Sequence, residues 1–174
     1  MTLVETWDAI RARRNVRSYE DRPIPAEHLD RILEAGWRAP SSMNDQPWDF
    51  VACTDRETLR ELAATWRYSE HVASSAVTVV LVAPDTQDRD ERDWFFYDLG
   101  QATMQMMVAA ADLGIGSSHA GIGDQDLARR VLGVPAGRLC VGMVALGYPA
   151  DRPLRPIERP NRRAHDEVVH RERW

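Results

Sequence analysis

The chain has 174 residues, of which 44% are apolar and 28% charged, and this length is typical of a single domain with one sizeable core. All 22 basic residues are arginines, against 27 acidic residues, which gives a formal net charge of −5. The lack of lysine excludes lysine Schiff-base chemistry and the P-loop, and the negative charge argues against a nucleic-acid-binding protein.

The first half of the sequence is predicted to alternate helices with strands. The spacing of its apolar residues predicts a helix at 3–13, a helix at 26–38, a strand at 48–53, a helix at 55–67 and a strand at 76–83. Thr54-Asp55 is a cap signal for the third of these helices. The apolar run that ends at Pro84 is typical of a strand that is buried on both faces.

The second half is organised around one long helix. The charged segment 85–93 is predicted to be an exposed loop, and the helix at 94–113 is apolar almost all round and therefore central. Gly114 stands where the end of a helix favours a left-handed residue. The remaining elements are a loop at 114–123, a helix at 126–132 and a strand at 141–146.

From residue 150 onward the chain is rich in proline and arginine and has few apolar residues before Val168-Val169. Such a tail cannot build its own core, so it is either disordered or lies over another surface. Val168, Val169 and Trp174 favour the second interpretation, because they could pack against that surface.

The sequence also predicts a soluble, cytoplasmic protein without a membrane partner. No apolar stretch reaches the roughly 18 residues of a membrane span, and the first residues lack the features of a signal peptide. Cys53 and Cys140 lie in apolar runs and are predicted to be small buried residues. No metal site is predicted, because the five histidines lack metal-ligand spacing.

Two polar segments could bind a ligand. Four arginines lie within residues 11–17, where a helix ends, and paired guanidinium donors suit a phosphate. A solvated basic helix end is the alternative. The loop 40–47 encloses small polar residues between two prolines, and these side chains are expected to face another group.

The glycine-rich stretch 114–123 fails three standard tests. A dinucleotide fingerprint needs glycine where His119 stands, a P-loop needs lysine, and a nucleophile elbow needs a preceding strand. The stretch is therefore either a simple connection or a loop whose backbone N–H groups can approach a ligand closely.

Five segments in chain order carry a resemblance to a known family. They are RRNVR at 13–17, APSSMNDQPW at 39–48, LGIG at 113–116, GYP at 147–149 and RRAHDEVV at 162–169. Together they resemble the nitroreductase family of FMN-dependent oxidoreductases, and the resemblance covers essentially the whole chain. Asn15 departs from the serine that is usual in the family at this position.

This resemblance implies an α+β fold in which helices surround a mixed β-sheet, as a single domain at 1–174 with an extended tail at 149–174. It also implies a homodimer in which each tail wraps the partner subunit. One FMN would lie at each of two interface sites.

The resemblance further implies which residues bind the cofactor. The first segment and the tail would hold the phosphate and ribityl chain, the loop after Ala39 would approach the flavin from the partner subunit, and backbone N–H groups would lie near its N5 edge. The implied residues are, in that order, Arg13, Arg14, Asn15, Arg17 and Arg162; Pro40, Ser41, Ser42, Asn44 and Gln46; and Gly121 and Ile122.

The implied activity is transfer of a hydride from NADH or NADPH through FMN to a nitroaromatic, quinone or similar electron-poor acceptor, in ping-pong order. This chemistry needs no side-chain acid or base, so no catalytic residue is predicted. The alternatives are a protein that sequesters FMN without turnover, and other flavin chemistry on the same fold, such as dehalogenation or flavin fragmentation. An unrelated globular domain is a further alternative.

Overall fold

The computed structural model of the chain describes residues 6–174. Its α-helices are α1 (Thr6–Ala12), α2 (Ala26–Trp37), α3 (Arg56–Ala64), α4 (Arg89–Asp112) and α5 (Gln125–Leu132). Its strands are β1 (Asp49–Cys53), β2 (Val77–Pro84), β3 (Gly116–Ala120) and β4 (Arg138–Gly147). Short 3-10 turns are η1 (Ser42–Asn44), η2 (Glu70–Ser74) and η3 (His165–Glu167).

The strands form one sheet in the order β1-β2-β4-β3. Each neighbouring pair of these strands is antiparallel. A parallel contact comes from outside them, as an isolated bridge between Asn15 and Ser117 at the β3 edge. In the described residues, the parallel component of the expected mixed sheet is therefore limited to this bridge.

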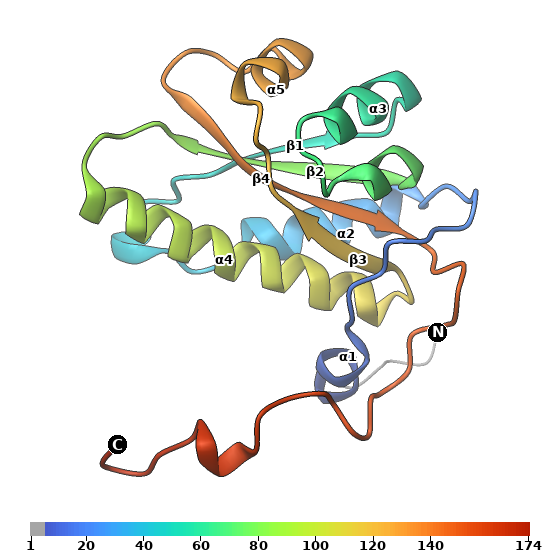
Figure 1. Cartoon of the computed structure of the whole chain (residues 1–174), viewed down its shortest axis with the longest axis vertical. Helices are drawn as coiled ribbons and strands as arrows, with labels where there is room; N and C mark the ends of the chain where they lie inside the picture. The colour runs from blue at the N-terminus through green and yellow to red at the C-terminus, as the bar shows by residue number, and fades with distance from the viewer. Residues whose placement is uncertain (1–5) are drawn as a thin grey trace.

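The sheet lies between two helical layers (Figure 1), with α2 and α4 on one face and α3 and α5 on the other. Because side chains alternate along a strand, β2 contributes to both cores. Val79 and Leu81 pack with residues of α2 and α4, while Val80 and Val82 pack with residues of α3 and α5. All residues from Val77 to Ala83 are buried, which confirms the prediction of a strand covered on both faces.

Most predicted elements are confirmed. The helices expected at 26–38, 55–67 and 126–132 and the three expected strands are present, with small differences at their ends. The first predicted helix is present over Thr6–Ala12, and its predicted residues before Thr6 lie outside the described part of the chain. The Asp55 carboxylate caps α3 by accepting a hydrogen bond from the Thr58 amide (2.9 Å), and Gly114 is left-handed with φ of 71°.

The prediction of an exposed loop at 85–93 is wrong in its second half, because α4 begins at Arg89. The Asp88 carboxylate accepts hydrogen bonds from the Asp90 and Glu91 amides at 2.9 and 3.0 Å. Acidic residues in a first turn also interact favourably with the helix dipole. The charges that resembled a solvated loop therefore start the longest helix.

The prediction of a loop throughout 114–123 is also wrong, because β3 occupies Gly116–Ala120. Its sequence, GSSHA, lacks the apolar residues that identify most strands. The strand forms because its backbone pairs with β4 along its whole length, from Gly116 opposite Gly147 to Ala120 opposite Met143.

The tail from residue 150 lies almost entirely on the surface. Figure 1 shows it leaving the sheet, passing α1 and ending away from the body. Its root is attached to α1, where the Arg11 guanidinium pairs with Glu158 (2.8 Å) and the Ile157 amide donates to the Arg11 carbonyl (3.1 Å). Beyond the residues attached to α1, the tail has the exposed apolar residues Val168 and Val169.

Both cysteines are buried and unpaired. Burial raises the pKa of the Cys53 thiol to about 11 and also raises the pKa of Cys140. The two thiols are therefore uncharged near neutral pH, as expected of structural rather than reactive cysteines. Within residues 6–174, no helix is both long and apolar enough to cross a lipid bilayer.

Candidate functional site

The arginine segment that follows α1 is fixed against the edge of the sheet. The Val16 amide donates a hydrogen bond to the Ser117 carbonyl (2.9 Å), and the Val16 side chain is 1% exposed. A Cβ on Gly116 would lie 2.7 Å from the Val16 side chain, so the glycine is required for this close approach. The backbone of the segment is therefore held by β3 while its long side chains extend outward.

Tyr19 fixes the other end of this segment. Its hydroxyl donates to the Val16 carbonyl (2.6 Å) and lies 3.0 Å from the Ser118 hydroxyl. Burial raises the pKa of Tyr19 to about 12, which keeps the phenol uncharged at neutral pH. The segment thus has a defined conformation before it meets a ligand.

Arg13 and Arg17 are the arginines of this segment that are available to an anion. No carboxylate of residues 6–174 forms an ion pair with either of them, and Arg13 contacts the Asn15 side-chain oxygen at 3.4 Å. Arg13 and Arg162 line one groove of about 860 Å³ between α1, α2 and α4. The structure thus brings together two of the predicted phosphate-binding arginines.

Arg17 faces a different hollow, which it lines with Arg67, Tyr68 and His71. Burial lowers the pKa of His71, and the positive charge of Arg17 lowers it further. This hollow is therefore lined by two guanidinium groups beside a histidine that is neutral at pH 7. In a single chain, Arg17 and Arg13 lie on separate concave surfaces.

Arg14 is already engaged within the chain. Its guanidinium donates to the Asp151 carboxylate (2.8 Å) and to the Arg152 carbonyl (2.7 Å). The hydrogen bond from Arg14, and then one from the backbone of Arg152, lower the pKa of Asp151. Arg14 therefore attaches the start of the tail to the arginine segment, a role that its place in an arginine cluster did not reveal.

The loop between α2 and β1 forms a second candidate surface, over a cavity of about 600 Å³ that Ser42, Gln46, Trp94 and Asp98 help to line. Pro40, Asn44 and Gln46 are exposed, and Ser41 and Ser42 are partly buried. The Gln46 amide donates to the Ser41 hydroxyl (3.0 Å), and the Gln46 side chain donates to the Asn44 carbonyl (3.0 Å). The loop therefore has an ordered conformation with its polar side chains near the surface.

Gly121 and Ile122 follow β3 directly and adjoin an aromatic residue that sequence reasoning missed. Trp66 packs against Gly121 and makes an edge-on contact with Tyr68, at 4.9 Å between ring centroids. The Arg67 guanidinium lies 4.6 Å from the Tyr68 ring centre. No periodic pattern in residues 65–75 indicates this aromatic cluster. The contact of Trp66 with Gly121 depends on where the chain runs after β3.

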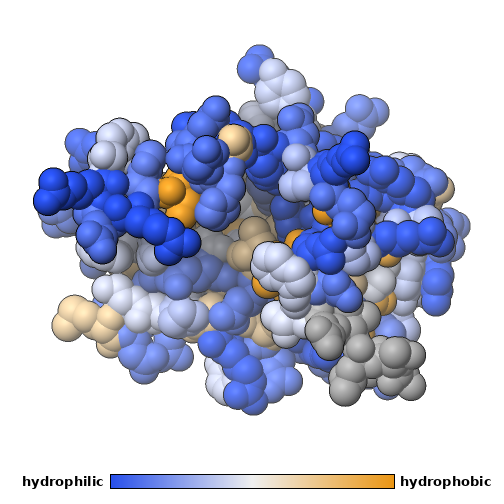
Figure 2. Space-filling view, turned by 90° about the horizontal axis from the view of Figure 1, so that it is seen from below, coloured by the Kyte–Doolittle hydropathy of each residue, from blue (hydrophilic) through white to orange (hydrophobic). Residues whose placement is uncertain are grey.

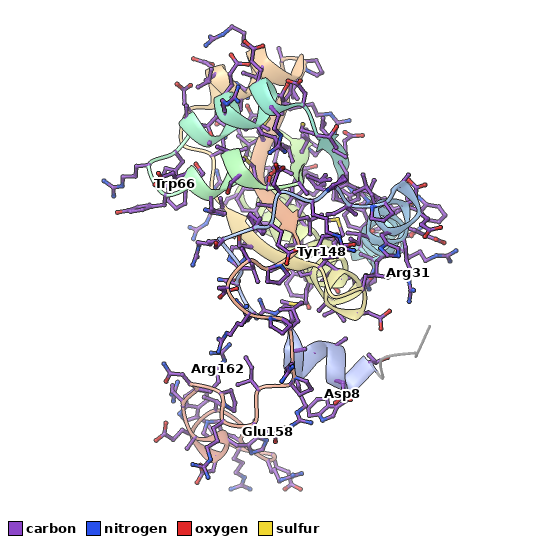
Figure 3. The ribbon with its side chains drawn as sticks, turned by 90° about the vertical axis from the view of Figure 1, so that its right-hand side faces the viewer. Asp8, Arg31, Trp66, Tyr148, Glu158 and Arg162 are labelled. Atoms are coloured by element: carbon purple, nitrogen blue, oxygen red, sulfur yellow. The ribbon has the colours of Figure 1, made fainter. Side chains whose placement is uncertain are left out.

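The predicted site residues do not form one complete site in a single chain. The 40–46 loop contacts α4 at Asp98, whereas the groove with Arg13 and Arg162 reaches α4 at Gln105 and Asp112. At 1.5 Å per residue, Asp98 is about 10 Å from Gln105 and about 20 Å from Asp112 along the helix. In Figure 3, Arg162 lies with the tail, away from Trp66 and therefore from Gly121.

Several large apolar side chains on the two helices that line these surfaces remain exposed. The set comprises Trp7, Ile10, Trp94, Phe96, Tyr97 and Met104, all on α1 or α4. Figure 2 shows the molecule from below, where apolar areas lie among mainly hydrophilic side chains. Exposed apolar residues of this size are typical of a surface that binds another protein. The side of α4 that faces the sheet is buried in the core, as predicted. The prediction that α4 is buried almost all round is wrong for its other side, which carries these exposed residues.

Comparison with known proteins agrees with this fold. Residues 10–76 and 62–148 match the model of the family described as Nitroreductase family. A protein of Archaeoglobus fulgidus, provisionally named an NADH dehydrogenase/NAD(P)H nitroreductase, is 31% identical over 176 residues, which cover 99% of this chain and 100% of the relative.

Solved structures have the same fold. An NADPH:FMN oxidoreductase from Vibrio harveyi, in complex with NAD+, is 27% identical with a TM-score of 0.82, over 95% of this chain and 76% of that one. An FMN-dependent nitroreductase from Clostridium difficile is 23% identical, also with a TM-score of 0.82, over 95% and 98% of the two chains.

Proposed function

The chain belongs to the nitroreductase family, and we propose that it is an NAD(P)H-dependent flavin oxidoreductase that binds FMN. The observation that carries this proposal is the arginine segment, in which Arg13 and Arg17 flank Asn15 on a backbone held by β3. Relatives with the same fold are named as FMN-dependent or FMN-reducing enzymes.

The chemistry of these residues fits FMN. The cofactor carries a phosphate, which suits the guanidinium groups of Arg13 and Arg162, and a chain of hydroxyls, which suits the Asn15 amide. Arg17 supplies a further positive charge, in the separate hollow that it lines with Arg67. Without lysine in the chain, arginine has to neutralise the phosphate, and its planar fork allows paired hydrogen bonds.

When bound, FMN supplies the redox chemistry, by accepting a hydride from NADH or NADPH and passing it to an electron-poor acceptor such as a nitroaromatic or a quinone. The residues of this chain would bind and orient the cofactor. The backbone N–H groups of Gly121 and Ile122 would donate hydrogen bonds, and Ser41, Ser42, Asn44 and Gln46 would contact it from the other side. We propose ping-pong order, which steady-state kinetics would contradict by requiring a ternary complex.

We also propose that two copies of the chain complete each FMN site. The 40–46 loop contacts α4 at Asp98, and Arg13 lies at a groove along the C-terminal half of the helix, so a second chain in antiparallel orientation can bring one of each together. The exposed apolar residues on α1 and α4 and the tail, with Val168 and Val169, would be buried by this pairing. We place the enzyme in the cytoplasm, where NAD(P)H is available.

The test is the visible spectrum of the purified protein, recorded before and after anaerobic addition of NADH or NADPH, together with its mass in solution. The expected result is a dimer with bound flavin whose colour bleaches on reduction. Bound flavin that keeps its colour would support sequestration without turnover instead. A colourless protein that takes up no added FMN would overturn the proposal altogether.

A further inference from the structure

Asp98 is a buried carboxyl group in the middle of the protein's longest helix. It is 2% exposed and lies on α4 beside the cavity that Ser42, Gln46 and Trp94 help to line. Burial of a polar group costs free energy unless it is hydrogen-bonded. Asp98 satisfies this requirement by accepting from the Ser42 amide to Oδ2 (2.9 Å) and from the Gln101 side chain to Oδ1 (3.1 Å).

The loop that Asp98 contacts has an unusual backbone. Met43, Asn44 and Gln46 have positive φ angles of 51°, 61° and 50°. Each such residue costs about 1 kcal/mol or more, and the conformation persists only when the surroundings enforce it. The Met43 side chain is 92% exposed, so its packing does not enforce the conformation.

The bonds inside the loop join its residues to one another, and none of them joins the loop to the helices. The Gln46 amide donates to Ser41, and the Asn44 amide donates to the Ser41 carbonyl at 3.1 Å. The bond from the Ser42 amide to Asp98, by contrast, connects the loop to α4 across 56 residues of sequence. This contact therefore places the strained loop relative to the rigid helix.

We propose that Asp98 is a positioning residue for the cofactor, which holds Ser42 and the strained turn after it in the conformation that receives FMN. This inference rests on the proposed function. In it, Asp98 does not touch the cofactor. It acts through the Ser42 amide. The loop is then already ordered when the protein has folded, so FMN binding does not have to order it.

The test compares Asp98→Ala with Asp98→Asn. Alanine leaves the Ser42 amide without its acceptor, whereas asparagine keeps one oxygen that can accept from it, and the Gln101 amide can turn to match. Asp93→Ala serves as a matched control, because Asp93 is an exposed carboxylate on the same helix. The dissociation constant for FMN and the hydrogen exchange of the 41–46 amides, without added FMN, are measured for all four proteins.

We expect Asp98→Ala to speed exchange of the Ser42 amide and to weaken FMN binding, each by about tenfold or more, a typical effect of losing such a hydrogen bond. Asp98→Asn should stay within a few-fold of the wild type, and Asp93→Ala should match it. Exchange of β2 amides reports whether the body remains folded. Unchanged loop exchange in Asp98→Ala, or an Asp98→Asn variant as impaired as alanine, would overturn the inference.

The two proposals fail in different ways. If the wild-type chain takes up no FMN, the proposed function fails while the loop exchange still reports the contact between Asp98 and Ser42. If the wild type binds FMN and oxidises NAD(P)H, but Asp98→Ala binds FMN equally well, the positioning role alone fails.

Discussion

The two surfaces assigned to the cofactor are held in place by different means. The arginine segment is built into the body, because Val16 is buried against Gly116 and Tyr19 bonds back to Val16. The 40–46 loop is instead strained and connected to α4 through a single buried carboxyl group. The first surface therefore depends on packing and the second on one hydrogen bond, so they should respond to opposite kinds of substitution.

The largest effect should come from adding volume under the arginine segment. In Gly116→Ala, the new Cβ would lie 2.7 Å from Val16, so the segment or the strand must shift. Overpacking of this kind costs about 1–3 kcal/mol in the free energy of unfolding. FMN binding should weaken as well, because Arg13 and Arg17 move with the backbone.

Gly100→Ala is the control for this substitution, measured by urea unfolding. Gly100 is inside α4 and has no neighbouring atom within 4 Å of its Cβ position. Alanine there should raise the free energy of unfolding by roughly 0.5–1 kcal/mol. If the two variants were equally stable, the close packing of Val16 would not hold the segment.

Removing a guanidinium group should leave the fold intact and weaken binding alone. Arg13→Ala and Arg162→Ala, which change the two arginines that share one groove, should each raise the dissociation constant for FMN by about tenfold or more, because a charged hydrogen bond to phosphate is lost. Arg60→Ala and Arg89→Ala remove exposed arginines outside both surfaces and should have little effect. Equal retention of FMN in all four variants would identify the cluster as solvated surface charge.

Tyr19 gives the arginine segment a pH dependence at high pH. The pKa of Tyr19 is about 12 in the folded chain and near 10 in the unfolded chain. Between these values the unfolded chain loses a proton that the folded chain keeps. The contribution of Tyr19 to the free energy of unfolding should therefore fall by about 1.4 kcal/mol per pH unit in this window, in addition to any contribution from Cys53.

The measurement is urea unfolding of the wild type and of Tyr19→Phe between pH 9 and 12. The phenylalanine variant should lack this contribution, although it loses the hydrogen bond to the Val16 carbonyl at every pH. Parallel stability profiles for the two proteins would show that Tyr19 titrates as in an unfolded peptide.

The smallest effect is expected in the loop, from removing a side chain. Met43→Gly relieves a positive φ of 51° and deletes a side chain that is 92% exposed. The substitution removes a conformational strain of about 1–2 kcal/mol in the folded chain. This gain is offset by the larger conformational entropy of glycine in the unfolded chain. Unfolding measurements should show a gain of less than about 1 kcal/mol, and a clear loss would contradict strain at this residue.

Local patterns in the sequence predicted most of the elements. The helix of Ala26–Trp37 and the buried strand β2 follow from the spacing of their own apolar residues, and Asp55 identified the start of α3. The arginine segment and the 40–46 loop are predicted to bind a ligand from residue type and resemblance. The resemblance placed them on different subunits, but the part of α4 that each contacts was not predictable, because it depends on tertiary packing.

Most of the helices, the core strand that is buried on both faces and the residue types available to hold an anion follow from the sequence, because these depend on neighbours along the chain. The tertiary structure decided that GSSHA is a strand, since its partner β4 is about 25 residues away. It also decided that Arg14 holds Asp151 while Arg13 faces a groove, and that Asp98 anchors a loop. These roles depend on hydrogen bonds between residues far apart in sequence, which no local pattern encodes.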